Sequence, residues 1–411
     1  MSVATAESGH EVEWLPPLQP GWKLRPLWSI FERIKDVDHP NEQMLSVFRD
    51  YGVVAKDSRD NLNQTAENRS IYQLVHPGWL VTNRMKAWQG SVGISSLRGI
   101  VSGHYICFAP RHREDSRYLN WLFRSPPYAY AYALLSRGVR IGQVEIDNDE
   151  YRLLPVLLPP LDEQRAIADY LDRETARIDA LIEEQGRLIE LLRERRRAAI
   201  AAAFSRDSDA RLRNVIEVAQ TGPFGTQLSA NEYFDDGIPV INPSHIKRGC
   251  IEPYPSVAVD HKKAAELARW QMRFGDIVLG RKGEVDKSAL VGDGEVGYIC
   301  GSDSMLLRPS PSTDCAYLWW FFQSPECHSQ LEQWSVGSTV AGLNQTTISK
   351  IVLPLPHLDE QRRIVAYLDE QTAKIDTLIV ETETFIELAR ERRAALITAA
   401  VTGQIDVRQV A

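Results

Sequence analysis

One long segment of this chain occurs twice, and the repeat limits the folds that the chain can adopt. Leu161-Asp162-Glu163-Gln164-Arg165 recurs unchanged as Leu358-Asp359-Glu360-Gln361-Arg362, a shift of 197 positions. Tyr170-Leu171-Asp172 and Arg193-Glu194-Arg195-Arg196 recur at the same shift. Solenoid repeats have much shorter periods of about 20–50 residues. We therefore expect a duplicated pair of domains with pseudo-twofold symmetry, which suits a nearly twofold target such as duplex DNA.

Each copy of the repeated segment predicts a long helix. A proline precedes it, and Asp162 or Asp359 stands in the place of an N-cap. Only Gly186 interrupts the first copy, and Thr402-Gly403 is a plausible end for the second. Apolar residues at heptad-like spacing predict a seam along each helix: Leu171, Ile178, Leu181, Leu188, Leu192 and Ala199, then Leu368, Ile375, Leu378, Phe385, Ala389 and Leu396. We expect the two helices to pair as an antiparallel coiled coil.

The rest of the chain predicts two globular parts of mixed α/β (α+β) character. Runs rich in β-branched and aromatic residues at 71–75, 79–82 and 105–108 indicate strands, and 118–123 indicates a short helix. The second globular part shows the same pattern with more divergence. The predicted division is a flexible N-terminal arm at 1–21, a globular domain at 22–160, a long helix at 161–205, a globular domain at 206–357, a long helix at 358–405 and a tail at 406–411.

Composition and charge exclude few classes of function. The net charge is −8, which argues mildly against a nucleic-acid partner. Residues 22–160, however, carry 18 Lys and Arg against 14 Asp and Glu, and 206–357 carry 14 against 18. The five cysteines have no metal-ligand spacing, and no stretch is long and apolar enough for a membrane span. We expect a cytoplasmic protein without a metal site or disulfide framework.

Two motifs could indicate catalysis. Ser125-Pro126-Pro127-Tyr128 resembles the tetrapeptide with which some amino-methyltransferases hold a base amine, but no S-adenosylmethionine loop accompanies it. The spacing Gly292, Gly294, Gly297 matches a dinucleotide-binding pattern, although a strand and not a helix follows. We interpret the first as a turn closing an aromatic helix and the second as a hairpin turn. No nucleophile–base constellation stands out.

Polar loops in the globular parts are candidates for reading DNA. Their Arg, Lys, Asn and Gln side chains suit the edges of guanine and adenine, and Arg84 and Arg281 fall at positions equivalent by the 197-residue shift. The candidate DNA-binding residues are Asn83, Arg84, Lys86, Gln89, Gln220, Thr221, Gln227, Asn242, Ser244, His245, Lys247, Arg281 and Lys282.

With two variable globular parts, each followed by a helix that opens with Leu-Asp-Glu-Gln-Arg, the chain resembles the specificity (S) subunits of type I restriction–modification systems. The resemblance covers nearly the whole chain. It implies two target recognition domains that each read half of a split DNA site, with the paired helices as a ruler between them. It also implies a subunit without catalytic residues, cofactor or metal of its own.

The same resemblance implies partners. Two methyltransferase (M) subunits with S-adenosylmethionine would dock on the helical frame, and restriction (R) subunits using ATP and Mg would join them. The frame or partner-binding candidates are Leu161, Asp162, Glu163, Gln164, Arg165, Leu358, Asp359, Glu360, Gln361 and Arg362. Two alternatives stay open: a stand-alone DNA amino-methyltransferase using Ser125–Tyr128, and a coiled-coil scaffold without DNA specificity.

Overall fold

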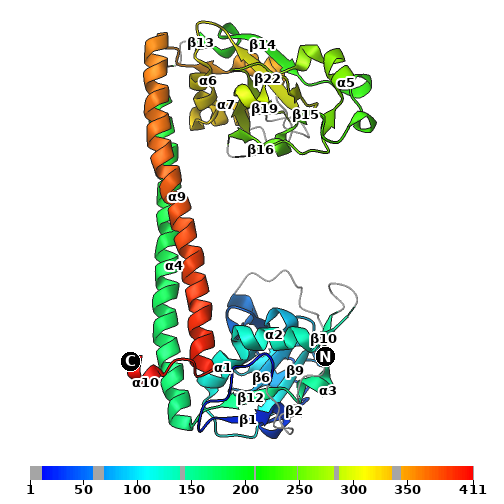
Figure 1. Cartoon of the computed structure of the whole chain (residues 1–411), viewed down its shortest axis with the longest axis vertical. Helices are drawn as coiled ribbons and strands as arrows, with labels where there is room; N and C mark the ends of the chain where they lie inside the picture. The colour runs from blue at the N-terminus through cyan, green and yellow to red at the C-terminus, as the bar shows by residue number, and fades with distance from the viewer. Residues whose placement is uncertain are drawn as a thin grey trace. The chain divides into compact units, whose positions relative to one another are not determined.

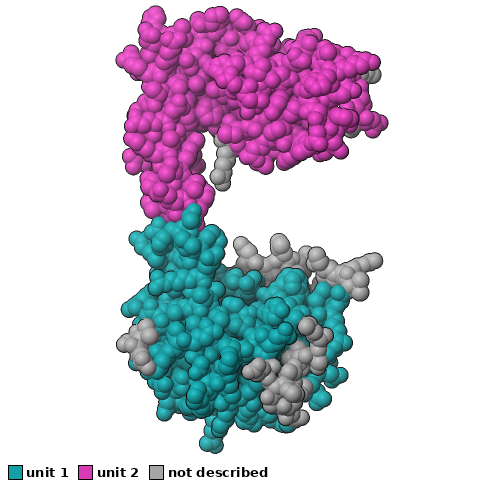
Figure 2. Space-filling view, in the orientation of Figure 1, with its two compact units in different colours: residues 1–185, 384–411 teal, residues 186–383 magenta. Residues whose placement is uncertain are grey.

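The computed structural model describes residues 12–58, 69–138, 144–207, 210–247, 249–281, 287–335 and 344–410. It divides into two compact units: unit 1 comprises residues 1–185 and 384–411, and unit 2 comprises 186–383 (Figure 2). Both long helices cross from one unit to the other, so each unit contains a globular part and one end of each helix. We call residues 22–160 head 1 and residues 206–357 head 2.

Head 1 contains a four-stranded antiparallel sheet in the order β2-β9-β6-β7, with shorter ribbons beside it (Figure 1). Its strands are β1 Lys23–Pro26, β2 Phe31–Ile34, β3 Leu45–Phe48, β4 Gly52–Ala55, β5 Gln73–Val75, β6 Leu80–Asn83, β7 Val92–Ile94, β8 Gly99–Val101, β9 Tyr105–Pro110, β10 Ser136–Arg137, β11 Glu145–Ile146 and β12 Pro155–Leu158. Its helices are α1 Ser116–Arg124, α2 Pro126–Leu134 and α3 Asn148–Tyr151.

Head 2 repeats this plan with a sheet in the order β14-β22-β19-β20 and adds a second sheet, β18-β15-β21. Its strands are β13 Ala210–Arg211, β14 Ile216–Thr221, β15 Ile238–Ile241, β16 Ile246–Lys247, β17 Cys250–Ile251, β18 Ala258–Val259, β19 Ile277–Gly280, β20 Ser288–Leu290, β21 Ile299–Cys300, β22 Ser304–Pro309 and β23 Val352–Leu353. Its helices are α5 His261–Glu266, α6 Cys315–Phe322, α7 Pro325–Ser335 and α8 Gln345–Lys350. The segment Gly292–Gly297 holds a short 3-10 turn at Asp293–Glu295 and is followed by β21, so it is no dinucleotide-binding loop.

The long helices are α4 Leu161–Phe204 and α9 Leu358–Val401, each of 44 residues, and a short α10 follows at Val407–Val410. Asp162 and Asp359 are not the N-caps that the sequence predicted. The backbone amide of Gln164 donates to the carbonyl of Pro160, and that of Gln361 donates to the carbonyl of His357. The helices therefore already include Leu161 and Leu358, the residues before the two aspartates. The Asp162 side chain is 99% exposed in the first turn. There a carboxylate still favours the helix dipole. At the other end, α9 stops as predicted before Gly403, whose φ is +71°.

The helices run antiparallel. In unit 1 the start of α4 meets the end of α9, where Arg393 donates to Asp179 at 3.1 Å. In unit 2 the end of α4 meets the start of α9, where Arg196 donates to Asp376 at 3.1 Å. The 197-residue shift converts one ion pair into the other with the two helices exchanged. The tandem mixed α/β fold with an antiparallel pair of long helices is therefore confirmed.

The predicted seam is only partly right. Leu171, Leu192, Leu368, Ile375 and Ala389 are buried, but four other predicted seam residues are exposed: Leu181, Leu188, Leu378 and Phe385. Their neighbours Ile189 and Ile386 are buried instead. An α-helix with 3.6 residues per turn drifts from a strict heptad, so the contact stripe moves across the helix surface along its length.

The N-terminal arm is also not free where it is described. Residues 1–11 and 411 lie outside the described residues, but Trp14 packs edge-on against Tyr128 with ring centroids 5.1 Å apart. Trp22 is buried in the core that head 1 shares with Ile167 of α4 and Val401 of α9. Aromatic burial against distant residues outweighs the local preference of its prolines for an irregular chain.

Candidate nucleic-acid interface

Three of the predicted DNA-binding residues gather at one hollow of head 1. Asn83, Lys86 and Gln89 lie at the end of β6 and in the turn that follows. With the β3–β4 turn and α2 they line a hollow of about 760 Å³, whose other residues include Arg49, Tyr51 and Tyr130. Both tyrosines are exposed. Amide and ammonium groups can hydrogen-bond to base edges, and exposed aromatic rings beside them can stack on bases.

Local hydrogen bonds hold the turn after β6 in one shape. The side chain of Asn83 accepts from the amide of Met85 at 3.1 Å, and the Trp88 indole donates to the carbonyl of Met85 at 3.1 Å. Gly90, with φ +85°, then returns the chain toward β7. Since a left-handed φ favours glycine, the sequence signal for this turn is Gly90 itself.

The opposite wall of the hollow is held by Arg124 at the end of α1. Its guanidinium donates to the carbonyls of Arg49 and Asp50 at 3.2 and 2.5 Å, which fixes the β3–β4 turn. Burial, together with the positive charge of Arg393, lowers the pKa of Arg124 to about 10. The group therefore stays charged at neutral pH and supports the turn.

Arg84 lies next to this hollow but is held by an acidic partner. Its guanidinium forms an ion pair with Glu145 at 2.6 Å, with both side chains partly exposed. Its backbone amide donates to the carbonyl of His104 at 2.9 Å. A role for Arg84 in reading a base remains a prediction, and that role would require it to exchange Glu145 for the base.

Arg281 occupies the matching place in head 2, as the sequence shift predicted. Its backbone amide donates to the carbonyl of Asp303 at 2.8 Å, the counterpart of the bond from Arg84 to His104. The side chain differs, because its Nε is buried without a hydrogen-bond partner. Lys282, the next predicted residue, lies outside the described residues.

Further unpaired polar atoms occur around Arg281 at the same end of the head 2 sheet. Gln220 near the end of β14, Asn242 just after β15 and Ser304 at the start of β22 each bury a side-chain atom without a hydrogen-bond partner. Backbone bonds place these segments together, since Gly222 donates to Ser304 and Gly301 donates to Ile241. Buried polar groups in native proteins are normally satisfied by protein, water or ligand. We call Gln220, Asn242, Arg281 and Ser304 the polar floor of head 2.

Sequence reasoning missed Ser304. A serine at the start of a strand carries no signal by itself. Its place becomes meaningful only because β22 pairs Ser304 with Gly280, the residue before Arg281.

The remaining predicted residues of head 2 are scattered. Thr221 offers its backbone carbonyl to Trp270, Gln227 closes a short exposed turn, Ser244 is exposed and Lys247 pairs with Glu252 at 2.7 Å. His245 is only 1% exposed and packs against Tyr254, and its contact with DNA stays a prediction that would require it to move to the surface. Burial lowers the pKa of its imidazole and favours the neutral form.

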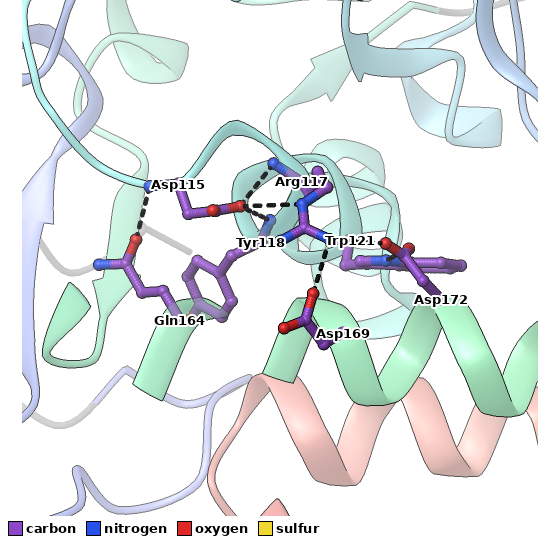
Figure 3. Close-up of polar contacts among 7 residues, drawn as sticks. All are labelled: Asp115, Arg117, Tyr118, Trp121, Gln164, Asp169 and Asp172. Carbon is purple, nitrogen blue, oxygen red and sulfur yellow. Dashed lines mark hydrogen bonds and ion pairs between the residues drawn. The ribbon is translucent and has the colours of Figure 1, made fainter. Parts of the chain in front are cut away.

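The glutamine of each Leu-Asp-Glu-Gln-Arg segment joins the head to the helix. Gln164 is buried, and its side-chain oxygen accepts from the amide of Asp115 at 2.9 Å (Figure 3). Its side-chain amide donates to the carbonyl of Pro159 at 2.8 Å. Gln361 makes the same bonds to Asp314 and Pro356, both at 2.8 Å. Asp115 and Asp314 in turn cap α1 and α6. The repeated glutamine thus anchors the first turn of the aromatic helix.

Other members of the repeated segment lie at the surface or support it. Glu163 accepts from the indole of Trp22 at 3.2 Å, and Glu360 accepts from Arg206 at 3.1 Å. The side chains of Asp359, Arg165 and Arg362 are largely exposed. Leu161 and Leu358 begin their helices.

The possible methyltransferase tetrapeptide is a structural element of head 1. Ser125 and Tyr128 are fully buried, and the Tyr128 hydroxyl donates to the carbonyl of Pro155 at 2.9 Å. Burial raises the pKa of this hydroxyl well above its ordinary value. Pro126 starts α2, as Pro325 starts α7 in head 2. These residues therefore begin a core helix and offer no accessible site for a base.

Within the described ranges, no group of three or more His, Cys, Asp or Glu side chains is placed to hold a metal ion. The same ranges contain no helix whose length and apolar character would suit it to cross a membrane. All five cysteines carry free thiols.

Comparison with known proteins agrees with this architecture. Residues 209–386 match the type I restriction modification DNA specificity domain. In this range the chain is similar to the DNA specificity domain of type I restriction–modification systems. The matched range contains nearly all of head 2 and the first part of α9. These elements carry the polar floor and Gln361.

The curated proteins that the chain is similar to are distant in sequence. The chain is 26% identical over 186 residues to the type I restriction enzyme EcoKI specificity subunit of Escherichia coli strain K12, covering 44% of this chain and 39% of that protein. It is 21% identical over 304 residues to the MjaVIII specificity subunit of Methanocaldococcus jannaschii, covering 67% and 68%. It is also 21% identical to the EcoBI specificity subunit of Escherichia coli, with 69% and 65% covered. The chain therefore spans about two fifths to two thirds of the length of these relatives.

Solved structures support the fold. A chain from a study of complex assembly and conformational transition of the type I R-M system has a TM-score of 0.75 at 17% identity and covers 95% of this chain and 100% of that one. The HsdS subunit from Thermoanaerobacter tengcongensis has a TM-score of 0.55 at 16% identity, with 95% and 99% covered.

Proposed function

We propose that this chain is the non-catalytic DNA-specificity subunit of a type I restriction–modification complex, in which head 1 and head 2 each recognise one half of a split DNA site. The observation that carries the proposal is that both heads are fastened to one antiparallel pair of helices by matching contacts, while their polar loops differ. A matching frame suits a fixed spacing between two readers. Different loops suit two different half-site sequences.

The hollow of head 1 and the polar floor of head 2 are the proposed reading surfaces. In head 1, Asn83, Lys86 and Gln89 would contact base edges or phosphates between Tyr51 and Tyr130. In head 2, the partly exposed side chains of Gln220, Asn242 and Arg281, each with an unpaired atom, would find hydrogen-bond partners on DNA, above the buried Ser304. Bases between the half-sites would need no direct contact, which leaves a gap of unspecified sequence.

Two methyltransferase subunits would dock on the helical frame, and restriction subunits would join them. Support comes from three apolar positions that are exposed in both copies of the helix: Leu181 with Leu378, Leu188 with Phe385, and Leu191 with Leu388. Exposed apolar residues that recur in both copies suit a partner that binds twice. Catalysis, with S-adenosylmethionine, ATP and Mg, would belong to those partners. A cytoplasmic location agrees with the five free thiols.

The test is a binding selection from random duplex DNA with the full chain co-expressed with its methyltransferase partner. We expect recovered sequences to contain two short unlike motifs at one fixed gap. Variants Leu191→Glu and Leu388→Glu should lose the methyltransferase during purification and remain folded. Recovery of a single continuous motif, or of no motif, would contradict the proposed function.

A further inference from the structure

Beside the apolar core that each head shares with the long helices, one tryptophan of its aromatic helix makes polar contacts to both of them. We propose that Trp121 and Trp320 are the centres of two positioning clamps that set the angle of each head on the helix pair, and thereby the gap between half-sites that the protein accepts. This inference rests on the proposed function.

The clamp of unit 1 joins three elements. Trp121 in α1 donates its indole N–H to Asp172 of α4 at 2.8 Å (Figure 3). The guanidinium of Arg393 in α9 lies over the indole ring, 5.9 Å from its centroid. Arg393 itself donates to Asp179 of α4. One side chain of the head thus contacts both helices, and an ion pair joins those helices beside it.

Unit 2 contains the same clamp with the helices exchanged. Trp320 in α6 donates to Asp369 of α9 at 2.8 Å. Arg196 of α4 lies 5.7 Å from the Trp320 ring centroid and donates to Asp376 of α9. Two copies of a contact that involves four side chains from three elements are hard to explain by helix packing alone.

A clamp at this place restricts rotation because it is the second of two anchors. The first anchor is Gln164 or Gln361, which holds the first turn of the aromatic helix. Asp172 and Asp369 lie eight residues further along their helices, about 12 Å at 1.5 Å per residue. Each head also shares an apolar core with the helices, and two polar anchors about 12 Å apart add a directional constraint along the helix that this core alone does not supply.

The two clamps differ in one additional contact. In unit 1, Arg117 donates to Asp169 at 2.7 Å and to Asp172 at 3.2 Å, so a second side chain of α1 reaches α4 (Figure 3). Aligned on the tryptophans, α6 has Ala316 at the place of Arg117. Loss of the tryptophan should therefore release head 2 more than head 1. This difference provides an internal comparison within one protein.

The experiment measures gap discrimination by the full chain with its methyltransferase partner. Duplexes carry the two selected half-sites at the preferred gap, or at a gap one base pair longer or shorter. Trp320→Phe should reduce the affinity ratio between these duplexes by about tenfold, the factor that corresponds to losing one hydrogen bond to a charged group. Trp121→Phe should reduce it less, and Trp121→Phe with Arg117→Ala should match Trp320→Phe. Affinity for a duplex with a single half-site should not change.

Controls separate positioning from folding. Trp28→Phe changes an exposed tryptophan of head 1 outside the clamp and should leave the ratio unchanged. Asp369→Asn keeps the shape and an acceptor oxygen, so it should remain folded and give an intermediate ratio. Phenylalanine variants that unfold at lower temperature but keep the native ratio would overturn the clamp. A native protein without any gap preference would instead overturn the proposed function.

Discussion

The two heads agree closely where they meet the helices and differ where they would meet DNA. At the helix side, Tyr118 donates to Leu157 at 2.9 Å and Tyr317 donates to Pro354 at 2.8 Å, and the glutamine and tryptophan anchors match equally well. At the opposite side, Arg84 is paired with Glu145 while the Nε of Arg281 is buried without a partner. The comparison indicates that a shared mechanical task keeps the frame constant. Under the proposed function, different half-sites would leave the reading residues free to diverge.

The largest expected effect concerns the shared side. Gln164→Leu or Gln361→Leu would leave the amide of Asp115 or Asp314 and a buried carbonyl without partners. We expect a loss of about 3 kcal/mol in the free energy of unfolding, similar in both variants, since each unpaired buried group costs about 1–3 kcal/mol. Chemical denaturation measures it. Asp162→Asn, at a fully exposed position of the same segment, is the matched control and should change little. A large effect in only one head would break the comparison.

A smaller effect should distinguish the reading sides. Arg281→Ala should weaken binding to the second half-site by about 2 kcal/mol, the typical value of a good arginine–base contact. Arg84→Ala should weaken binding to the first half-site by less, because Arg84 must first leave Glu145. Glu145→Gln should then strengthen binding to that half-site. Dissociation constants at one fixed salt concentration test this. Equal losses in both alanine variants would show that Glu145 does not restrain Arg84.

The smallest expected effect is a dependence on pH that both heads share. Burial lowers the pKa of His112 in head 1 and of His245 in head 2. The folded state therefore prefers the neutral imidazole, and the unfolded chain binds protons more readily as the pH falls below about 6.5. The free energy of unfolding should be fully present above that pH and should decrease below it. Denaturation at pH 7.5 and 5.5 tests this. The double variant His112→Gln with His245→Gln should show a smaller difference in the free energy of unfolding between the two pH values. An unchanged pH dependence in the double variant would exclude these two groups as its source.

Local patterns in the sequence predicted the frame well. The repeat and the prolines before it place the starts of α4 and α9 within a residue, Gly403 marks the end of α9, and the aromatic run at 118–123 lies inside α1. These features depend on short-range signals such as caps and periodicity. The equivalence of Arg84 and Arg281 followed from the same shift.

Contacts between distant residues could not be read from the sequence. Gln164 finds Asp115 49 positions away, and Trp14 finds Tyr128 more than 100 positions away, so neither the anchor nor the packed arm has a local signal. The seam was misplaced at Leu188 and Phe385 because helix drift accumulates over several turns. Burial of His245 depends on the position of Tyr254 and likewise has no signal in its own neighbourhood.

The central claim is that the paired helices set the distance between two half-sites. Deletion of one heptad from each helix, residues 184–190 and 381–387, tests it most directly, because these ranges correspond by the 197-residue shift and leave the Asp179–Arg393 and Arg196–Asp376 ion pairs in place. Each deletion removes about 10 Å of helix and about two turns, so the contact face is kept. Selection on duplexes with random gaps should return the native half-sites at a gap shorter by about 3 base pairs. The native half-sites at an unchanged gap would contradict the account.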